Sequence, residues 1–274
     1  MSTGVSQQEK AEGFLALHRR GDPLLMPNAW DLGSAALLAS LGFKALATTS
    51  SGHAATLGRL DGGVTRDEAL EHAAALSHGT DLPVSADLEN GFADEPEGVA
   101  DTVEKARATG LAGCSIEDYS GGQDAVYELA LARERVVAAA EAAHSGAVRL
   151  VLTARAENHI RGRDDLADTI ARLQAYQEAG ADVLFAPGIK RAEDIRQVVQ
   201  SVDRPVSVLA VPGVPSTAEL AGLGVARVSV GGAFAFAALG ALSEAATELR
   251  DSGTYGYLER SAIGGRAART AFGR

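Results

Sequence analysis

Short runs rich in Val, Leu and Ala alternate along the chain with longer segments of helical periodicity. Continuous apolar runs of this length are typical of strands buried on both faces, as in a parallel sheet whose connections are helices. Several of the intervening segments open with Asp, Ser or Thr and close on Gly, as helix termini do. Eight predicted strands begin near Leu24, Ala45, Pro83, Gly113, Arg149, Ala181, Pro205 and Arg227.

Eight strand and helix units in 274 residues match the size and rhythm of a (β/α)8 TIM barrel. A doubly wound sheet is the structural alternative, but the first strand is not followed by a G-x-G-x-x-G turn and no P-loop occurs. We therefore predict that residues 1–274 form a single α/β domain of the TIM-barrel class. An amphipathic helix near residues 6–20 is expected to precede the first strand.

The chain continues beyond the eighth predicted helix, which should end near Ser252 and Gly253. The segment that follows carries apolar and aromatic side chains, among them Tyr255 and Ile263. A closed barrel offers few vacant sites for such groups, and burying each is worth about 1.5 to 3 kcal/mol. We therefore expect residues 234–274, the C-terminal helix and tail, to contact a neighbouring subunit in a homodimer or homotetramer.

Composition and charge narrow the classes of partner. With 46% hydrophobic and 22% charged residues, the chain has an ordinary globular composition. The net charge of −11 would repel a nucleic-acid backbone or an anionic membrane, so neither is an expected partner. The single Cys cannot form an internal disulfide, and neither a signal peptide nor an apolar stretch of about 20 residues occurs. These features favour a cytoplasmic location.

Polar side chains gather where the predicted strands end, the face of a TIM barrel that carries the active site. Asp87 and Glu89 follow the third strand, and strand alternation should send both to one face. Glu117 ends the fourth strand, and Arg155 ends the fifth after an apolar run. Grouped acids repel one another unless a cation bridges them, and hard oxygen ligands that keep bound waters suit Mg²⁺. The Arg155 guanidinium suits a carboxylate or phosphate.

The alternative for each of these acids is a structural role, as a helix cap or in an ion pair. This alternative stays open for Asp118 and for Glu157 taken singly. It is less favoured for Asp87, Glu89 and Glu117 together, because two adjacent strands deliver them to one rim.

Other catalytic groups are less favoured. If Glu117 points into the barrel, alternation turns Cys114 towards the helix layer, where it would be a buried structural residue. No Lys stands at a predicted strand end, which argues against a Schiff-base mechanism. His53 and His159 fall in strand-end loops and remain weak candidates.

Taken in order, these positions resemble the motifs of the isocitrate lyase and phosphoenolpyruvate mutase superfamily, Mg²⁺-dependent barrels that act on small 2-oxo or 2-hydroxy carboxylates. The resemblance runs from about Asn28 to Gly232. The stretch 87–91 is similar to the family's Asp-Ala-Asp-Thr-Gly, with Glu in place of the second Asp. The other similar stretches are Leu-Gly-x-x-Asp at 57–61, Ile-Glu-Asp at 116–118, Ala-Arg-x-Glu at 154–157 and the Ser-Gly loop at 50–52.

The resemblance implies a set of roles for these residues. Asp87 would bind Mg²⁺, or Mn²⁺, directly, with Glu89, Glu117 and Asp61 acting through its waters. The metal would polarise a 2-oxo carboxylate and stabilise an enolate as an adjacent bond breaks. Substrate binding is assigned to Ser50, Ser51, Gly52, Asp87 and Arg155, and catalysis to Arg155, Glu117 and Tyr119, with Tyr119 as a candidate proton donor.

The loop after the fourth predicted strand departs from the family pattern. Lyases of the family carry Lys-Lys-Cys-Gly-His there, and the mutases and phosphonopyruvate hydrolases carry Lys with Asn or Thr. Residues 119–124, Tyr-Ser-Gly-Gly-Gln-Asp, contain none of these, although Gly121 and Gly122 would let the loop 119–128 close as a lid.

Three functions therefore remain. The leading hypothesis is a Mg²⁺-dependent lyase that cleaves a C–C bond of a small 2-oxo or 2-hydroxy carboxylate. The alternatives are a P–C bond phosphonomutase or phosphonopyruvate hydrolase, and a barrel that binds an oxo acid without turnover. Family members also exchange their last helix between subunits, which would give residues 234–274 a partner.

Overall fold

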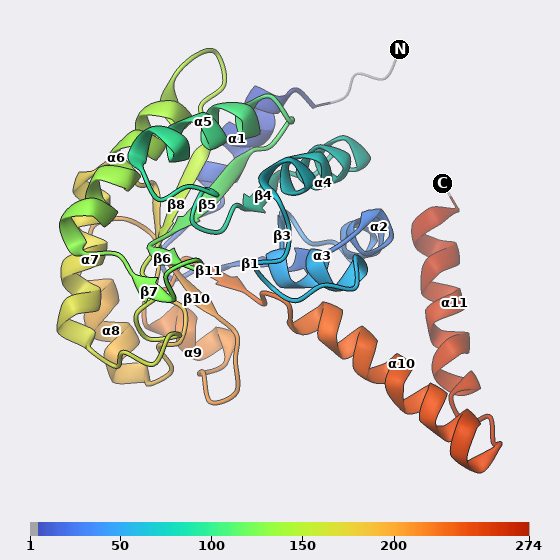
Figure 1. The fold of residues 1–274 in the computed structure, drawn as a ribbon. Helices are drawn as coiled ribbons and strands as arrows, with labels where there is room; N and C mark the ends of the chain where they lie inside the picture. The colour runs from blue at the N-terminus through green and yellow to red at the C-terminus, as the bar shows by residue number, and fades with distance from the viewer. Residues whose placement is uncertain (1–4, 274) are drawn as a thin grey trace.

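A parallel sheet that curls into a barrel organises the computed structural model, which describes residues 5–273 (Figure 1). Within these residues the sheet has nine segments in the order β1-β11-β10-β9-β8-β5-β4-β3-β2. Strands β1 (Leu24–Met26) and β2 (Asn28–Ala29) flank Pro27; β1 pairs with β11 and β2 with β3. Together they act as one strand that closes the ring, so the predicted (β/α)8 TIM barrel is confirmed.

The predicted strands are all present, and helices cover the outside of the ring (Figure 1). The other barrel strands are β3 (Leu46–Thr48), β4 (Val84–Asp87), β5 (Gly113–Glu117), β8 (Val151–Arg155), β9 (Val183–Phe185), β10 (Val206–Leu209) and β11 (Arg227–Ser229). The helices are α1 (Gln7–Ala16), α2 (Leu32–Ser40), α3 (Ser50–Thr56), α4 (Arg66–Gly79), α5 (Pro96–Arg107), α6 (Leu129–His144), α7 (Leu166–Glu178), α8 (Ala192–Ser201), α9 (Thr217–Gly222), α10 (Ala233–Ser252) and α11 (Leu258–Phe272).

Two apolar clusters separate the outside of the barrel from its inside. Side chains that point outward from the strands pack with the helices, and Cys114 is fully buried among them, as predicted. Burial raises the pKa of the Cys114 thiol to about 12, which keeps it protonated. A smaller interior cluster brings Phe14 of α1 against Leu24 and Val151, so α1 closes the amino-terminal end of the barrel.

Local structure differs from the sequence prediction at three places. Helix α1 ends at Ala16, short of residue 20. The segment after β3 is a helix, α3, because the Thr49 hydroxyl caps it by accepting a hydrogen bond from the Gly52 N–H at 3.2 Å. The loop after β5 contains a short antiparallel hairpin of β6 (Tyr119–Ser120) and β7 (Ala125–Val126).

The C-terminal segment contains a second helix, α11, in the part for which the sequence predicted only a tail. Helix α10 ends where expected, at Ser252, with Gly253 in the left-handed conformation at φ 63°. Figure 1 shows α10 pointing away from the barrel and α11 returning beside α2. Phe236 and Leu242 of α10 stay 51% and 65% exposed. Among residues 5–273, no helix has the length and hydropathy needed to cross a membrane.

Candidate active site

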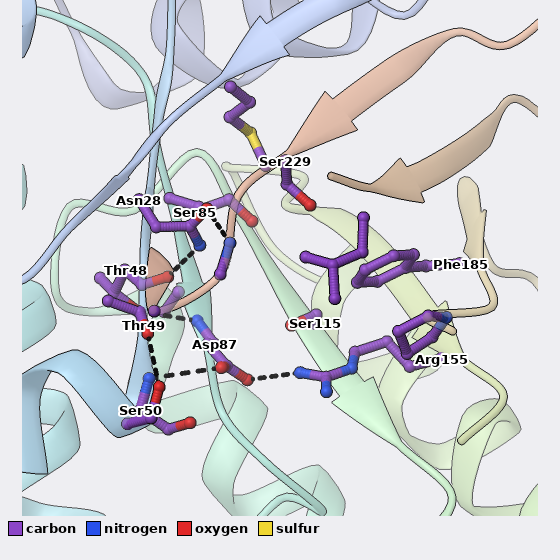
Figure 2. A pocket seen from close by; sticks show the side chains of 18 of the residues that line it. Asn28, Thr48, Thr49, Ser50, Ser85, Asp87, Ser115, Arg155, Phe185 and Ser229 are labelled. Carbon is purple, nitrogen blue, oxygen red and sulfur yellow. Dashed lines mark hydrogen bonds and ion pairs between the residues drawn. The ribbon is translucent and has the colours of Figure 1, made fainter. Parts of the chain in front are cut away.

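A pocket of about 180 Å³ lies where the strands end, as expected for this fold (Figure 2). Strands from all round the ring contribute to it, because the carboxyl ends of parallel strands meet on one face. Asp87 comes from β4, Ser115 from β5, Arg155 from β8 and Ser229 from β11. A second hollow of about 320 Å³ shares Ser50, Asp61 and Arg155 with this pocket.

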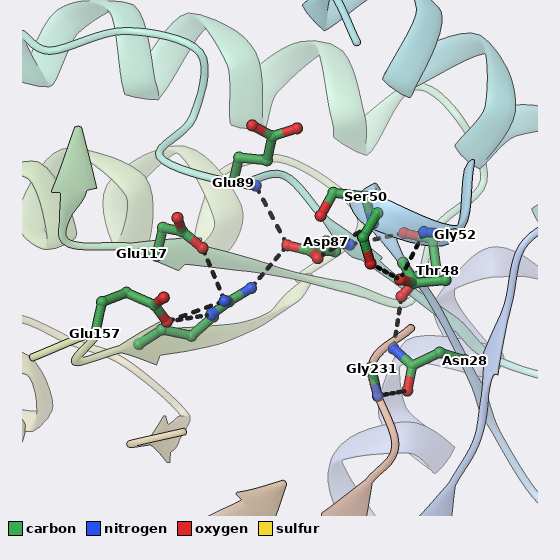
Figure 3. Close-up of polar contacts among 12 residues, drawn as sticks. Asn28, Thr48, Ser50, Gly52, Asp87, Glu89, Glu117, Glu157 and Gly231 are labelled. Atoms are coloured by element: carbon green, nitrogen blue, oxygen red, sulfur yellow. Dashed lines mark hydrogen bonds and ion pairs between the residues drawn. The ribbon is translucent and has the colours of Figure 1, made fainter. Parts of the chain in front are cut away.

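Arg155 is the centre of an ion-pair network at this face, and Figure 3 shows its carboxylate partners Asp87, Glu117 and Glu157. Its Nη1 lies 2.9 Å from Asp87 Oδ1, and its Nη2 lies 2.8 Å from Glu117 Oε2. Its Nε and Nη2 also contact Glu157 Oε1, at 3.0 and 2.9 Å. Burial opposes the charge on this guanidinium, but the three carboxylates outweigh burial and hold the Arg155 pKa well above its ordinary value.

The carboxylates of the network outnumber the guanidiniums that neutralise them. Burial raises the pKa of Glu117 and of Glu157, against the attraction of Arg155. Arg161 adds a second, more distant cation, with its Nη2 3.6 Å from an oxygen of each glutamate. The structure therefore brings Asp87 and Glu117 together around Arg155, at a site with more carboxyl groups than guanidiniums.

Asp87 is fixed by backbone and side-chain contacts from neighbouring elements. Its N–H donates to Thr48 Oγ1 at 2.8 Å, and its Oδ2 accepts from the Ser50 N–H at 3.3 Å. Thr48 and Ser50 belong to the end of β3 and the start of α3, so the strand before β4 sets the position of this carboxylate.

Glu89 lies at the site, as predicted, but the structural reason differs from the one predicted. Strand β4 ends at Asp87, so strand alternation does not place Glu89; its backbone is left-handed, with φ 49°. Burial, together with the charges of Asp87 and Asp61, raises the Glu89 pKa to about 7. Glu89, Asp61 and Glu117 line the second hollow, which confirms their proximity.

The donor set fits a hard cation that keeps much of its water. Among the described residues, no three His, Cys, Asp or Glu side chains converge closely enough to hold a metal ion by themselves. Mg²⁺ is commonly held by one or two carboxylates and several waters. Asp61, Glu89 and Glu117 line one hollow, and Asp87 lines the adjoining pocket with Asp61. Acids spaced in this way, with a raised Glu89 pKa, are consistent with binding through waters.

The predicted carboxylate-binding segment forms the first turn of α3. Ser50 and Ser51 line the pocket, whereas Gly52 lies behind them and donates its N–H to Thr49. A Cβ on residue 52 would lie 2.5 Å from Thr49 Cγ2, so only glycine fits there. The structure thus brings Ser50 and Ser51 to the pocket and gives Gly52 a packing role.

Tyr119 stands on the hairpin beside the second hollow, next to Glu117. Its hydroxyl donates to Asp124, and the guanidinium carbon of Arg161 lies 3.5 Å from the ring centroid. The hydrogen bond to Asp124 raises the Tyr119 pKa above its ordinary value, so the phenol carries its proton at neutral pH.

Asp118 has the structural role that the sequence left open. It accepts the Glu157 N–H at 2.8 Å, Arg172 Nη1 at 3.0 Å and the Tyr176 hydroxyl. Arg172 also donates to Tyr127 O at 2.9 Å. This buried network ties β5, β8, α7 and the end of the hairpin together behind the site.

Two further residues shape the site and were missed in the sequence. Asn28 donates to Thr48 O at 2.7 Å and accepts the Gly231 N–H at 2.9 Å, which joins both sides of the barrel seam (Figure 3). Arg161 lies in the loop after β8, where no strand pattern marks it. The position of Asn28 at the end of the first predicted strand could have indicated a role at the site. Nothing in the sequence around Arg161 could have done so.

Comparison with known proteins agrees with this geometry. The family model of phosphoenolpyruvate phosphomutase matches residues 14–250, which include every barrel strand. The chain belongs to the isocitrate lyase and phosphoenolpyruvate mutase superfamily. The resemblance found in the motifs is therefore confirmed.

Individual members of the superfamily are similar over most of the chain. A structure from Burkholderia cenocepacia J2315, provisionally named a lyase/mutase, is 50% identical with a TM-score of 0.89 and covers 92% of both chains. A second from the same organism, provisionally named a phosphonomutase, is 35% identical with a TM-score of 0.84, over 91% of this chain and 100% of the other. The 2-methylisocitrate lyase of Halalkalibacterium halodurans is 30% identical over 73% of this chain and 67% of its own.

Proposed function

We propose that this protein is a Mg²⁺-dependent lyase that cleaves a C–C bond of a small 2-oxo or 2-hydroxy carboxylate. The observation that carries the proposal is the placement of Arg155 between Asp87 and Glu117 at the pocket, with more carboxylates around it than it neutralises. The similarity to 2-methylisocitrate lyase supports lyase chemistry within the superfamily.

The residues divide into those that hold the metal and those that hold the substrate. Asp87 would bind Mg²⁺ directly, and Glu89, Glu117 and Asp61 would accept hydrogen bonds from its waters. When bound, the ion would polarise the 2-oxo or 2-hydroxy group and stabilise the negative charge that develops as the adjacent bond breaks. Asp87 would then release Nη1 of Arg155, which could hold a substrate carboxylate beside Ser50 and Ser51 while Glu117 and Glu157 keep their contacts with the same guanidinium.

We assign protonation of the enolate to Tyr119 of the β6–β7 hairpin. Tyr119 is protonated at neutral pH and lies beside Glu117, and the exposed glycines of the hairpin, Gly121 and Gly122, would allow it to approach the pocket. In this arrangement the tyrosine hydroxyl would exchange its hydrogen bond with Asp124 for one with the reacting carbon or an intervening water.

A second candidate is P–C bond chemistry, as a phosphonomutase or phosphonopyruvate hydrolase. The similarity to the Burkholderia structure named a phosphonomutase favours it. The retained metal and oxo-acid residues would serve either reaction, since both proceed through charge that develops on the same oxo-acid fragment.

A panel of 2-oxo and 2-hydroxy acids, incubated with the protein and Mg²⁺, separates these functions. Release of pyruvate, glyoxylate or carbon dioxide that stops on chelation with EDTA would support the lyase. Consumption of phosphonopyruvate alone would support P–C chemistry. Binding of the acids without any turnover would support a non-catalytic barrel and contradict the proposal.

A further inference from the structure

A second arginine lies inside the barrel, beneath Arg155. Arg227 points inward from β11, is only 3% exposed and lines the pocket together with Ser85, Ser115 and Ser229. Figure 2 shows these three serines around the interior of the pocket. The interior layers of TIM barrels are dominated by bulky branched side chains. This barrel instead has hydroxyl groups and a guanidinium at the floor of its pocket.

The contacts of Arg227 are all with uncharged groups. Its Nε donates to Ser207 Oγ at 2.9 Å, and its Nη1 donates to Thr153 Oγ1 at 3.1 Å and to His18 Nε2 at 3.3 Å. His18 donates from Nδ1 to Phe14 O at 2.8 Å, and burial lowers its pKa to about 3, so its Nε2 is a neutral acceptor. In the described chain, Nη2 of Arg227 has no hydrogen-bond partner.

This arginine has no counter-ion, unlike Arg155 and Arg161 at the mouth of the pocket. None of the ion pairs among residues 5–273 includes Arg227, and burial lowers its pKa to about 9, with Arg155 adding repulsion. Arg155 and Arg172, by comparison, each contact buried carboxylates. Because a buried charge without a partner is costly, a charged side chain that also lines a pocket indicates that an anion completes it.

We propose that Arg227 forms an anion subsite that receives the distal carboxylate of the substrate. This inference rests on the proposed function, in which the proximal carboxylate lies at Arg155 and Ser50. Thr153, which contacts Arg227, precedes Arg155 by two residues on β8, a rise of about 6.6 Å. The two arginines therefore lie at different depths of the barrel, as the two ends of a diacid would require. Ser115, level with Thr153 in the β5–β8 register, and Ser229 would supply further hydrogen bonds along it.

Calorimetric titrations in the presence of Mg²⁺ test the subsite with matched ligands. Malate and 2-hydroxybutanoate differ in having a carboxylate or a methyl at the distal end, as do 2-hydroxyglutarate and 2-hydroxypentanoate. In the full-length protein, at least one diacid should bind about tenfold or more tightly than its matched monoacid, as a hydrogen-bonded charge pair would give. Oxalate, which is too short to reach Arg227, reports on the metal and Arg155 alone.

The variants Arg227→Met and Arg227→Lys assign the preference to this side chain. Arg227→Met should remove the preference for the diacid while oxalate affinity stays within about threefold, and Arg227→Lys should retain part of it. If Arg227→Met is unfolded, Arg227→Gln, which keeps polar contacts without charge, takes its place. Equal loss of oxalate and diacid binding in the folded variants would show a structural role and overturn the subsite.

The wild-type titrations distinguish failure of the subsite from failure of the proposed function. Absence of Mg²⁺-dependent oxalate binding would contradict the proposed function. Oxalate binding without a diacid preference would leave the function standing and overturn the role of Arg227.

Discussion

Arg155 and Asp87 form an ion pair at 2.9 Å across the mouth of the barrel, from the ends of strands β8 and β4. The intervening strand β5 contributes Glu117 to the same guanidinium. A cation bound at Asp87 would compete with Arg155 for that carboxylate. The pair therefore couples metal binding to the release of an arginine that can hold substrate.

Replacing Asp87 tests the direct metal ligand. We expect Asp87→Ala to abolish Mg²⁺ binding measured by calorimetry, while circular dichroism shows an intact fold, because Asp87 lies at the barrel rim and Arg155 keeps two other carboxylate partners. Asp67→Asn, which changes an acid exposed on α4, is the matched control and should bind Mg²⁺ normally. Unchanged affinity in Asp87→Ala would refute the assignment.

Cys114 should be dispensable for turnover. It is fully buried in the cluster that faces the helices, away from the pocket, and its thiol stays protonated. We expect Cys114→Ala to keep activity within about threefold of wild type, with stability lowered by about 1 kcal/mol for the lost packing. A folded Cys114→Ala protein that is inactive would mean that the sulfur takes part in the reaction.

His18 should make the protein sensitive to acid. Its pKa falls from 6.5 to about 3 in the folded protein, so the unfolded chain binds a proton that the folded chain excludes. Neutral His18 therefore contributes fully to the free energy of unfolding above pH 6.5. This contribution declines as the pH falls towards 3, by up to about 1.4 kcal/mol per pH unit. In urea titrations from pH 7 to 4, His18→Gln should therefore lose stability less steeply than wild type. Parallel pH profiles would contradict this.

We propose that α10 and α11 exchange with a neighbouring subunit. Leu25, which points outward from β1, is 44% exposed although helices normally cover such positions, and α10 carries its own exposed apolar side chains. Light scattering should show a dimer or tetramer. Leu242→Glu should weaken this association more than Glu244→Gln on the same helix. A wild-type monomer, or an oligomer that survives deletion of residues 234–274, would rule the exchange out.

The barrel could be predicted because each strand and helix carries its own local pattern. Pro27 divides the first strand, but the apolar run on both sides still indicated a single unit. Asp87, Glu117 and Arg155 could be placed because they end strands, and the position of a strand end is set by the fold. The helical form of residues 258–272 was missed, since a segment with two adjacent glycines and only three large apolar side chains, Leu258, Ile263 and Phe272, has a weak helical pattern.

The contacts made between distant segments could not be predicted. Arg227 occupies the start of a strand, and nothing in its neighbours in sequence shows that only hydroxyls and His18 surround it. Glu89 was expected at the site for the wrong reason, because the left-handed turn after Asp87 depends on the packing of the loop and not on strand alternation. The position of Arg161 likewise depends on how the loop after β8 packs against the β6–β7 hairpin.

Proton exchange at the carbon next to a 2-oxo group tests the central claim most directly, because it requires stabilised charge on the oxo acid and does not depend on the physiological substrate. Proton NMR in D₂O would follow pyruvate and 2-oxobutanoate in the presence of the protein and Mg²⁺. We expect the signals next to the carbonyl to disappear faster than with Mg²⁺ alone, the loss to stop with EDTA, and Arg155→Met to abolish it. Exchange no faster than in the protein-free control for both acids would contradict the central claim.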